Sequence, residues 1–216
     1  MKLIIGNKNY SSWSLRPWLL LSFHNVEFEE IRLPLFVDNF EEKLKNYTGA
    51  GFVPVLKDND LTIWDSLAIC EYISEHYLSG TGWPADPKAR AEARSCSAEM
   101  HSGFSNIRNN MPMNARGTDR NIEITPAIKK EINRINSLWI DLRNRYSKNG
   151  PWLFGEFSIA DCMFSPIVFR FKTYGVVLKG TADAYMDFVL NHPLIQGWLK
   201  ESKNEKETID RSEVGI

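Results

Sequence analysis

The first third of the chain alternates between strand-like and helix-like hydrophobic patterns. The run KLIIGN at residues 2–7 is short, β-rich and ended by Gly and Asn, which predicts a strand. From Leu15 onward apolar residues recur at helical spacing, and the run FEEIRLPL at residues 28–35 alternates as a half-buried strand does. Residues 51–64 read as two strands joined by an Asp-Asn-Asp turn, and residues 65–77 as a helix that starts with Asp and Ser. The predicted order is βαβ-ββα, with one short helix before the hairpin.

A break in the pattern follows these elements. The stretch SGTGWPADP gathers Gly, Pro and Ser, which are typical of a linker, and every periodic segment after it is helical. We therefore predict an α/β domain at residues 1–78, a linker at residues 79–86 and an all-helical domain at residues 87–216.

The helical part has recognisable helix starts. Asp86 followed by Pro predicts a cap and a first helical position, and we expect this helix to run toward Asn110. A second long helix is predicted at residues 126–146, and a third begins within FSIADCMF at residues 157–164. The tail after Lys203 is charged, and we expect it to fray.

Composition narrows the class of protein. With 216 residues, 43% hydrophobic, 25% charged and a formal charge of −1, the chain has the composition of a globular protein and no basic field for nucleic acid. The N-terminal apolar run is too short for a signal peptide, and no apolar stretch approaches the roughly 18 residues that span a bilayer. Neither the three cysteines nor the four histidines have metal-ligand spacing. We expect a soluble cytoplasmic protein without a metal, nucleic-acid or membrane partner.

A cluster of serines precedes the first predicted helix. Serines at this place are most often helix caps, because their hydroxyls accept bonds from the unpaired first amides. Pro17 has no N–H and fits best in the first helical turn, so the pattern favours Ser14 as the cap. Ser11 and Ser12 then lie just outside the helix, at the positive end of its dipole, where an anion can bind.

Two dipeptides in the same α/β unit have both a structural and a functional interpretation. A trans Val53-Pro54 bond only opens a strand, whereas a cis bond turns the backbone N–H and C=O of Val53 outward toward an extended peptide. At Asp65-Ser66 a strand passes into a helix that either residue can cap. Alternatively, Ser66 and the helix dipole bind an α-carboxylate while Asp65 binds an α-ammonium group.

These motifs, in this order and spacing, resemble the thioredoxin-like domain of glutathione S-transferases. SSWSLRPWLLL is similar to the SSCS motif of the zeta class, the maleylacetoacetate isomerase-like enzymes. GFVPVL resembles the family's Val-Pro turn, DSLAICEYI its Glu/Gln-Ser contact with glutathione, and Ser158 to Asp161 its capping box. The resemblance covers nearly the whole chain. It implies a thioredoxin-like α/β domain followed by an all-α helical bundle.

The resemblance implies a catalytic role for two serines. Ser11, aligned with the first serine of the zeta motif, would hydrogen-bond the sulfur of glutathione, and Ser12 is the nearest substitute. Trp13 stands where the zeta enzymes carry a cysteine, so this helix start lacks a redox-active thiol. That replacement argues against a mixed-disulfide route.

The resemblance also implies how the rest of glutathione binds. Val53 would pair with the cysteinyl backbone across a cis Pro54, and Asp65 and Ser66 would hold the γ-glutamyl end. Asp65 is one methylene shorter than the Glu or Gln usual in the family, which shortens its reach to the ammonium group.

A site for a second substrate is expected between the domains, beside the first helix of the helical part. Met100, Phe104 and Arg108 recur there at helical spacing, and Trp13 can line the same cleft. Such a stripe is more often core than pocket, but Arg108 suits an anionic or electrophilic substrate. Arg170 resembles a substrate-carboxylate arginine of the zeta enzymes but comes about three residues too early, so we expect it on a helix surface.

The sequence therefore predicts a cytoplasmic glutathione S-transferase, dimeric by family resemblance and without a metal. It would activate the glutathione thiol for attack on an electrophilic small molecule or for a glutathione-assisted isomerisation. A glutathione-dependent reductase or peroxidase is one alternative, and a non-catalytic binding or interaction module with the same fold is another. The presence of Ser11, Val53 and Ser66 together argues against the non-catalytic module.

Overall fold

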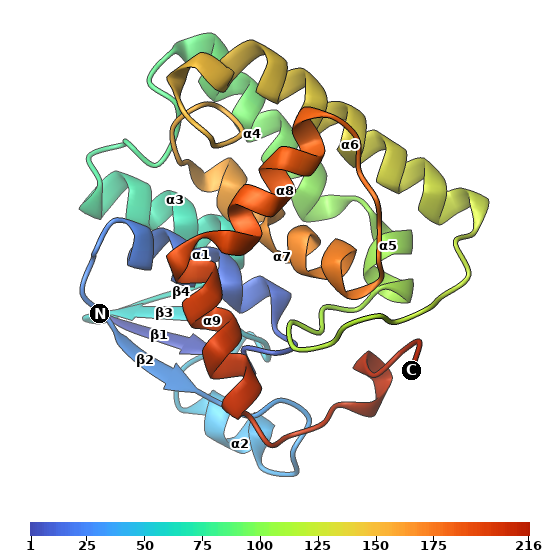
Figure 1. The fold of residues 1–216 in the computed structure, drawn as a ribbon. Coiled ribbons are helices and arrows are strands. Elements are labelled where there is room, and N and C mark those ends of the chain that lie inside the picture. The colour runs from blue at the N-terminus through green and yellow to red at the C-terminus, as the bar shows by residue number, and fades with distance from the viewer.

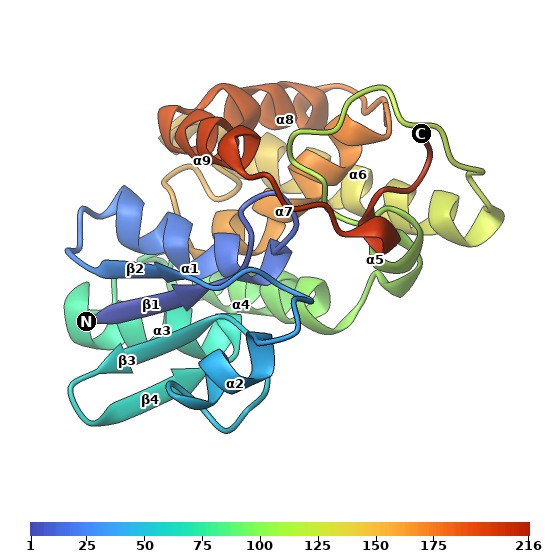
Figure 2. The same cartoon turned by 90° about the horizontal axis from the view of Figure 1, so that it is seen from below.

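A four-stranded mixed sheet forms the N-terminal domain of the computed structural model, which describes residues 1–216. The strands lie in the order β2-β1-β3-β4 (Figures 1 and 2), with β1 parallel to β2 and the pairs β1/β3 and β3/β4 antiparallel. They are β1 (Lys2–Ile5), β2 (Glu29–Arg32), β3 (Val55–Asp58) and β4 (Leu61–Trp64). Because parallel strands need a crossover, α1 (Ser12–Phe23) connects β1 to β2. The predicted βαβ-ββα order is confirmed.

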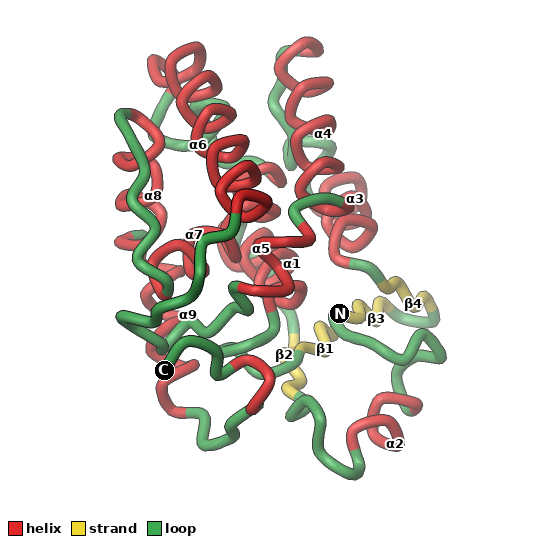
Figure 3. Tube along the Cα trace, turned by 90° about the vertical axis from the view of Figure 1, so that its right-hand side faces the viewer, coloured by secondary structure: helices red, strands yellow, loops and turns green.

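The two faces of the sheet are covered by different helices. Successive side chains of β1 point to opposite faces: Leu3 and Ile5 lie in the main core, and Ile4 lies in a smaller cluster. Helices α1 and α3 (Ser66–Tyr77) pack on the main-core face, and the short helix α2 (Phe40–Lys45) contributes to the smaller cluster. Figure 3 shows α2 beyond the sheet, away from the other helices. Helix α1 also packs against the helical part of the chain.

The C-terminal domain is entirely helical. Its elements are α4 (Pro87–Ser102), α5 (Ser105–Asn110), α6 (Pro126–Tyr146), η1 (Ser147–Asn149), α7 (Ile159–Thr173), α8 (Thr181–Asn191), α9 (Pro193–Asn204) and η2 (Asp210–Ser212). All residues of α7 except Lys172 are buried, and α7 packs against both α1 and α4, so it joins the two domains. No helix in the structure combines the length and the apolarity that crossing a bilayer requires.

The helix that starts after Asp86 is shorter than expected. It ends at Ser102 and does not continue to Asn110. Gly103 closes it by donating its N–H to the carbonyl of Glu99 (2.8 Å), and Phe104 then adopts a left-handed backbone with φ of 57° before α5 begins. A left-handed residue cannot continue a right-handed helix, which explains the break.

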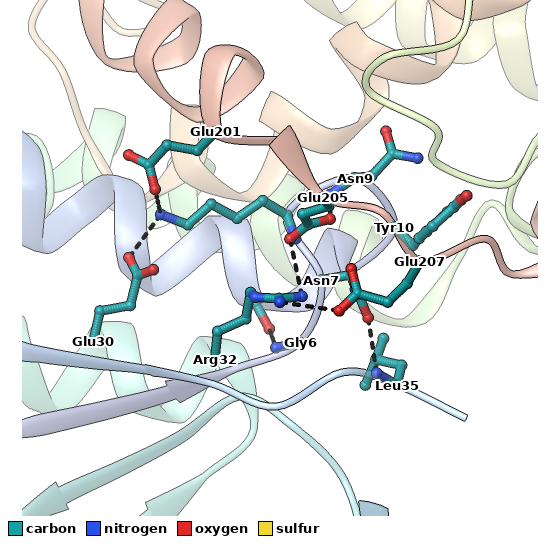
Figure 4. A network of polar contacts seen from close by, with 12 residues as sticks. Gly6, Asn7, Asn9, Tyr10, Glu30, Arg32, Leu35, Glu201, Glu205 and Glu207 are labelled. Atoms are coloured by element: carbon teal, nitrogen blue, oxygen red, sulfur yellow. Dashed lines mark hydrogen bonds and ion pairs between the residues drawn. The ribbon is translucent and has the colours of Figure 1, made fainter. Parts of the chain in front are cut away.

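Residues 205–216, called the strap below, lie along the boundary between the domains, and the expectation that the tail after Lys203 frays is wrong. Glu205 accepts hydrogen bonds from the backbone N–H groups of Lys8 (2.6 Å) and Asn9 (3.0 Å), which come from the loop after β1 (Figure 4). The charged tail is ordered because its carboxylates meet donors of the N-terminal domain, and charge-assisted hydrogen bonds are stronger than neutral ones.

Candidate functional site

The first helix begins earlier than the sequence pattern favours. It starts at Ser12 with Ser11 in the cap position, so the prediction that Ser14 is the cap was wrong. Pro17 consequently lies inside the helix. Eight of the 12 residues of α1 are buried, and their packing compensates for the backbone bond that a proline cannot make.

The hydroxyl of Ser11 belongs to a short chain of hydrogen bonds. Gly6 N–H donates to Ser14 Oγ (3.1 Å), which in turn lies 2.7 Å from Ser11 Oγ. Either hydroxyl can donate in this pair; when Ser14 donates to Ser11, the Ser11 proton is left for a ligand. Ser11 and Ser12 both line a cavity of about 280 Å³. An anion in this cavity meets a hydroxyl donor at a helix N-terminus.

A second cavity, of about 260 Å³, contains the two predicted dipeptides. The Val53-Pro54 bond is cis. The residues that line this cavity are Trp13, Phe52, Val53, Pro54, Asp65 and Ser66. Trp13, Phe52 and Val53 also line the Ser11 cavity, so the two cavities adjoin. Together they have the form of an extended groove between the starts of α1 and α3.

Asp65 uses both oxygens of its carboxylate within the protein. Oδ1 accepts hydrogen bonds from the N–H groups of Leu67 (2.9 Å) and Ala68 (3.1 Å), so Asp65 caps α3. Oδ2 lies 3.0 Å from Nε2 of His101, on α4. A carboxylate has about four acceptor positions, so three are occupied and one on Oδ2 remains for a ligand donor. The capping and ligand-binding interpretations of Asp65 are therefore compatible.

A buried arginine that the sequence analysis missed, Arg16, contacts Ser66. Arg16 donates from Nη1 to Ser66 Oγ (3.2 Å), and its guanidinium lies 4.3 Å from the centre of the Trp13 ring. Because the Ser66 oxygen accepts from Arg16, the Ser66 proton is available to a ligand. Arg16 is 3% exposed, makes no ion pair, and has no partner for Nε. Its one sequence signal is a cation within an otherwise apolar helix.

Burial has a clear electrostatic effect on Arg16. Removal from water, together with the nearby cation of Arg108, lowers the pKa of its guanidinium to about 9. A buried cation without an anionic partner is costly, and an anion bound in the adjacent cavity offsets that cost. The surroundings of Ser66 thus favour a carboxylate ligand.

A third and larger cavity, of about 770 Å³, opens between the domains. Its wall includes Trp13, His101 and three arginines, Arg108, Arg170 and Arg211, and no carboxylate side chain lines it. Trp13 is the residue that this cavity shares with the other two. Its ring contacts His101 edge-on, with ring centres 5.4 Å apart.

Arg170 lies in this cavity wall, and the expectation that it lies on a helix surface is wrong. It is 5% exposed and donates to the backbone carbonyls of Met111 and Arg108 and to Ser12 Oγ (3.3 Å). Burial lowers its pKa to about 10. An arginine about one helical turn before the expected position still faces the same side of α7, because residues three apart share a helix face.

Two of the predicted pocket residues do not line the cavity. Met100 (1% exposed) and Phe104 (7% exposed) lie in the main core, whereas Trp13 and Arg108 do line the cavity as predicted. The apolar stripe is used for packing between helices. Arg108 itself donates to the carbonyls of Met100 and His101, at 3.1 and 2.8 Å.

Comparison with known protein families decides the relationship of the chain. The profile of the glutathione S-transferase N-terminal domain matches residues 10–76, and that of the glutathione S-transferase C-terminal domain matches residues 125–201. The chain belongs to the glutathione S-transferase family. The first match contains the Ser11 helix, the Val53-Pro54 bond and Asp65-Ser66, and the second contains the capping box of α7.

Two relatives and one solved structure show what the chain is similar to. The chain is 34% identical over 99 residues to a probable maleylacetoacetate isomerase of Caenorhabditis elegans, an alignment that spans 46% of each protein, about half their length. It is 27% identical over 173 residues to maleylacetoacetate isomerase of Rattus norvegicus, with 78% of each covered. The fold is similar to that of a glutathione transferase homologue from Burkholderia gl BGR1 solved with bound glutathione, with a TM-score of 0.70, 22% identity, and 95% and 98% of the two chains covered.

Proposed function

We propose that the protein is a glutathione transferase in which Ser11 stabilises the glutathione thiolate. The observation that carries this proposal is the hydrogen-bond chain from Gly6 through Ser14 to Ser11 at the start of α1, beside a cavity. The γ-glutamyl carboxylate binds at Ser66, the ammonium group at the remaining acceptor of Asp65, and the cysteinyl backbone beside Val53. This placement follows the groove formed by the two smaller cavities.

The energy needed to ionise the thiol is within reach of these groups. Lowering a thiol pKa from about 8.5 by two units requires about 2.7 kcal/mol. A hydrogen bond to a charged atom contributes about 1.5–3 kcal/mol, and a helix terminus about 0.3–1 kcal/mol more. No general base is required. Because nucleophilicity falls as the pKa falls, with a slope of about 0.4–0.5, most of the gain in thiolate is lost in rate. Positioning of the second substrate must supply the rest.

The second substrate binds in the large interdomain cavity. Arginine side chains in its wall, without a carboxylate among them, favour a small electrophile that carries a negative charge. Transfer of glutathione to such a molecule and glutathione-assisted isomerisation use the same thiolate attack. The relatives named maleylacetoacetate isomerase support isomerisation as the second candidate activity.

Redox chemistry through a protein thiol has less support. Cys70, Cys96 and Cys162 are buried, none lines the three cavities, and burial raises the pKa of each thiol. A buried thiol with a raised pKa is a poor nucleophile. A reductase that forms a mixed disulfide with its own cysteine is therefore not proposed.

The experiment that tests the proposal measures the pKa of the bound thiol. Glutathione binding is measured by calorimetry, and the thiolate absorbance of the complex is followed against pH for the wild type, Ser11→Ala and Ser12→Ala. We expect Ser11→Ala to raise the bound thiol pKa by about one to two units, and Ser12→Ala to change it much less. An unchanged pKa in Ser11→Ala contradicts the role of Ser11, and absence of glutathione binding contradicts the proposal as a whole.

The domain division, location and assembly are part of the same proposal. We place the glutathione-binding domain at residues 1–78, the linker at residues 79–86 and the helical domain at residues 87–216, in a cytoplasmic homodimer. Phe52 and Trp64 support association, because their large side chains are 49% and 51% exposed on the N-terminal domain. Light scattering at several concentrations tests the dimer, and a constant monomer mass contradicts it.

A further inference from the structure

We propose that Arg211, on the strap, recognises the negative charge of the second substrate and so makes residues 205–216 a specificity element. This inference rests on the proposed function, because it concerns the cavity beside the glutathione thiolate. Arg211 lines both the Ser11 cavity and the large interdomain cavity. It is the one arginine that faces both.

The other two arginines of the large cavity already have most of their donors engaged. Arg108 donates to the backbone carbonyls of Gly103, His101 and Met100, so it closes the end of α4. A guanidinium that satisfies backbone carbonyls is held in place and has few donors left for a ligand. Its role is mainly structural.

Arg170 is engaged in the same way. Its Nη1 donates to two backbone carbonyls and its Nη2 to Ser12 Oγ, and the residue is 5% exposed. It adds positive potential to the cavity, but turning its donors to a ligand breaks bonds that the buried loop before α6 needs.

Arg211 differs because it makes no hydrogen bond or ion pair within the chain. Its guanidinium lies over the ring of Phe36, whose centre is 3.7 Å from the guanidinium carbon. A guanidinium that stacks on an aromatic ring keeps its edge free, and its five N–H donors can meet a carboxylate in a two-bond arrangement. Arg211 is therefore the one arginine of this cavity whose donors are all available for an anion.

The strap holds Arg211 in place at both ends. Glu205 is bound by the N–H groups of Lys8 and Asn9, and Glu213 accepts hydrogen bonds from Tyr10, Asn114 and Arg120. Figure 2 shows the red strap continuing from α9 beside the helical domain and the loop after β1. The residue between these anchors is positioned without any bond from its own guanidinium, which leaves that group for recognition.

The test compares two glutathione conjugates that differ in one charge. S-hexylglutathione carries a neutral substituent, and an S-carboxyalkyl glutathione of equal length carries an anionic one. Calorimetry measures the dissociation constants of both conjugates for the wild type, Arg211→Gln, Arg211→Lys and the control Lys203→Gln. The control removes the same charge from an exposed residue of α9 that lines none of the three cavities. We expect Arg211→Gln to weaken binding of the carboxylated conjugate about tenfold and binding of the neutral conjugate less than about twofold. Arg211→Lys should be intermediate, and Lys203→Gln should match the wild type.

The possible results separate the two proposals. If Arg211→Gln weakens both conjugates equally, Arg211 only docks the strap, and the inference is overturned. It is equally overturned if Arg211→Gln binds both as the wild type does. If the folded wild type binds neither conjugate nor glutathione, the proposed function itself fails.

Discussion

His101 Nε2 lies 3.0 Å from Asp65 Oδ2, and the two residues come from different domains. Asp65 caps α3 in the N-terminal domain, and His101 lies near the end of α4 in the helical domain. The imidazole also meets the edge of Trp13, which lines all three cavities. Asp65 lines the proposed glutathione groove and His101 the large interdomain cavity, so this pair joins the walls of the two across the domain boundary.

The first prediction concerns the pH dependence of this pair. Burial lowers the pKa of His101, while Asp65 opposes this shift and Arg16 and Arg108 add to it. A base with a lowered folded pKa contributes stability above its unfolded value, about 6.5, and loses it as the pH falls toward the folded pKa, because the unfolded chain binds the proton more readily. Urea unfolding of the wild type and His101→Asn between neutral pH and the acid side of this window measures the effect.

We expect the free energy of unfolding of the wild type to fall faster with acidification than that of His101→Asn. His24→Asn is a comparison variant, because burial alone lowers the pKa of that histidine and no charged group opposes it. Parallel curves for the wild type and His101→Asn contradict the prediction.

The second prediction concerns Ser14. Ser14→Ala removes the acceptor of Gly6 N–H and the neighbour that orients Ser11. We expect the free energy of unfolding to fall by about 1 kcal/mol, and the bound glutathione thiol pKa to rise by less than in Ser11→Ala. Ser14→Thr keeps a hydroxyl and serves as the control. An unchanged thiol pKa in Ser14→Ala means that Ser11 is oriented by something else.

The third prediction separates binding from stability at Arg16. Arg16→Met removes a buried charge without an ion pair but retains an unbranched side chain against Trp13. We expect glutathione to bind about tenfold more weakly, because Ser66 loses the donor that orients its hydroxyl. The midpoint of urea unfolding should not fall, since the cost of burying the cation disappears. If Arg16→Met binds glutathione normally but unfolds at a lower urea concentration, the role of Arg16 is purely structural.

The fourth prediction concerns the capping box of α7. Asp161 accepts hydrogen bonds from the N–H groups of Leu153 and Ser158 and from the Tyr185 hydroxyl, all buried. Asp161→Ala leaves these donors without an acceptor, and we expect it to lower the free energy of unfolding by about 3 kcal/mol. Ser158→Ala, which removes one capping side chain, should cost about 1 kcal/mol. Equal losses in the two variants contradict this account.

The fold was predictable because its signals are local. Alternation in Leu3, Ile4 and Ile5 reports the two faces of a strand, and Val53-Pro54 and Asp65-Ser66 mark element starts. Family resemblance then predicts that the serine motif is a ligand site. The exact helix start was not predictable, because the interior Pro17 is tolerated only through tertiary packing.

The missed parts of the candidate site depend on contacts distant in sequence. Nothing near His101 indicates a partner 36 positions away at Asp65. The carbonyls that hold Arg170 belong to Arg108 in α5 and to Met111 just after it, so its burial could not be read from α7 alone. The charged tail had the composition of a frayed end, and only the donors around Lys8 and Arg120 show that its acids are bound.

The course of the strap has a mechanical consequence. The chain passes between the two domains once before α4 and again after α9, and the second passage is fastened on both sides of the interdomain cavity. Hinge rotation about the first connection must therefore stretch the second. Any such rotation must break the bonds of Glu205 and Glu213 in addition to the packing of α7 on α1, so the strap and the buried helix resist the same movement.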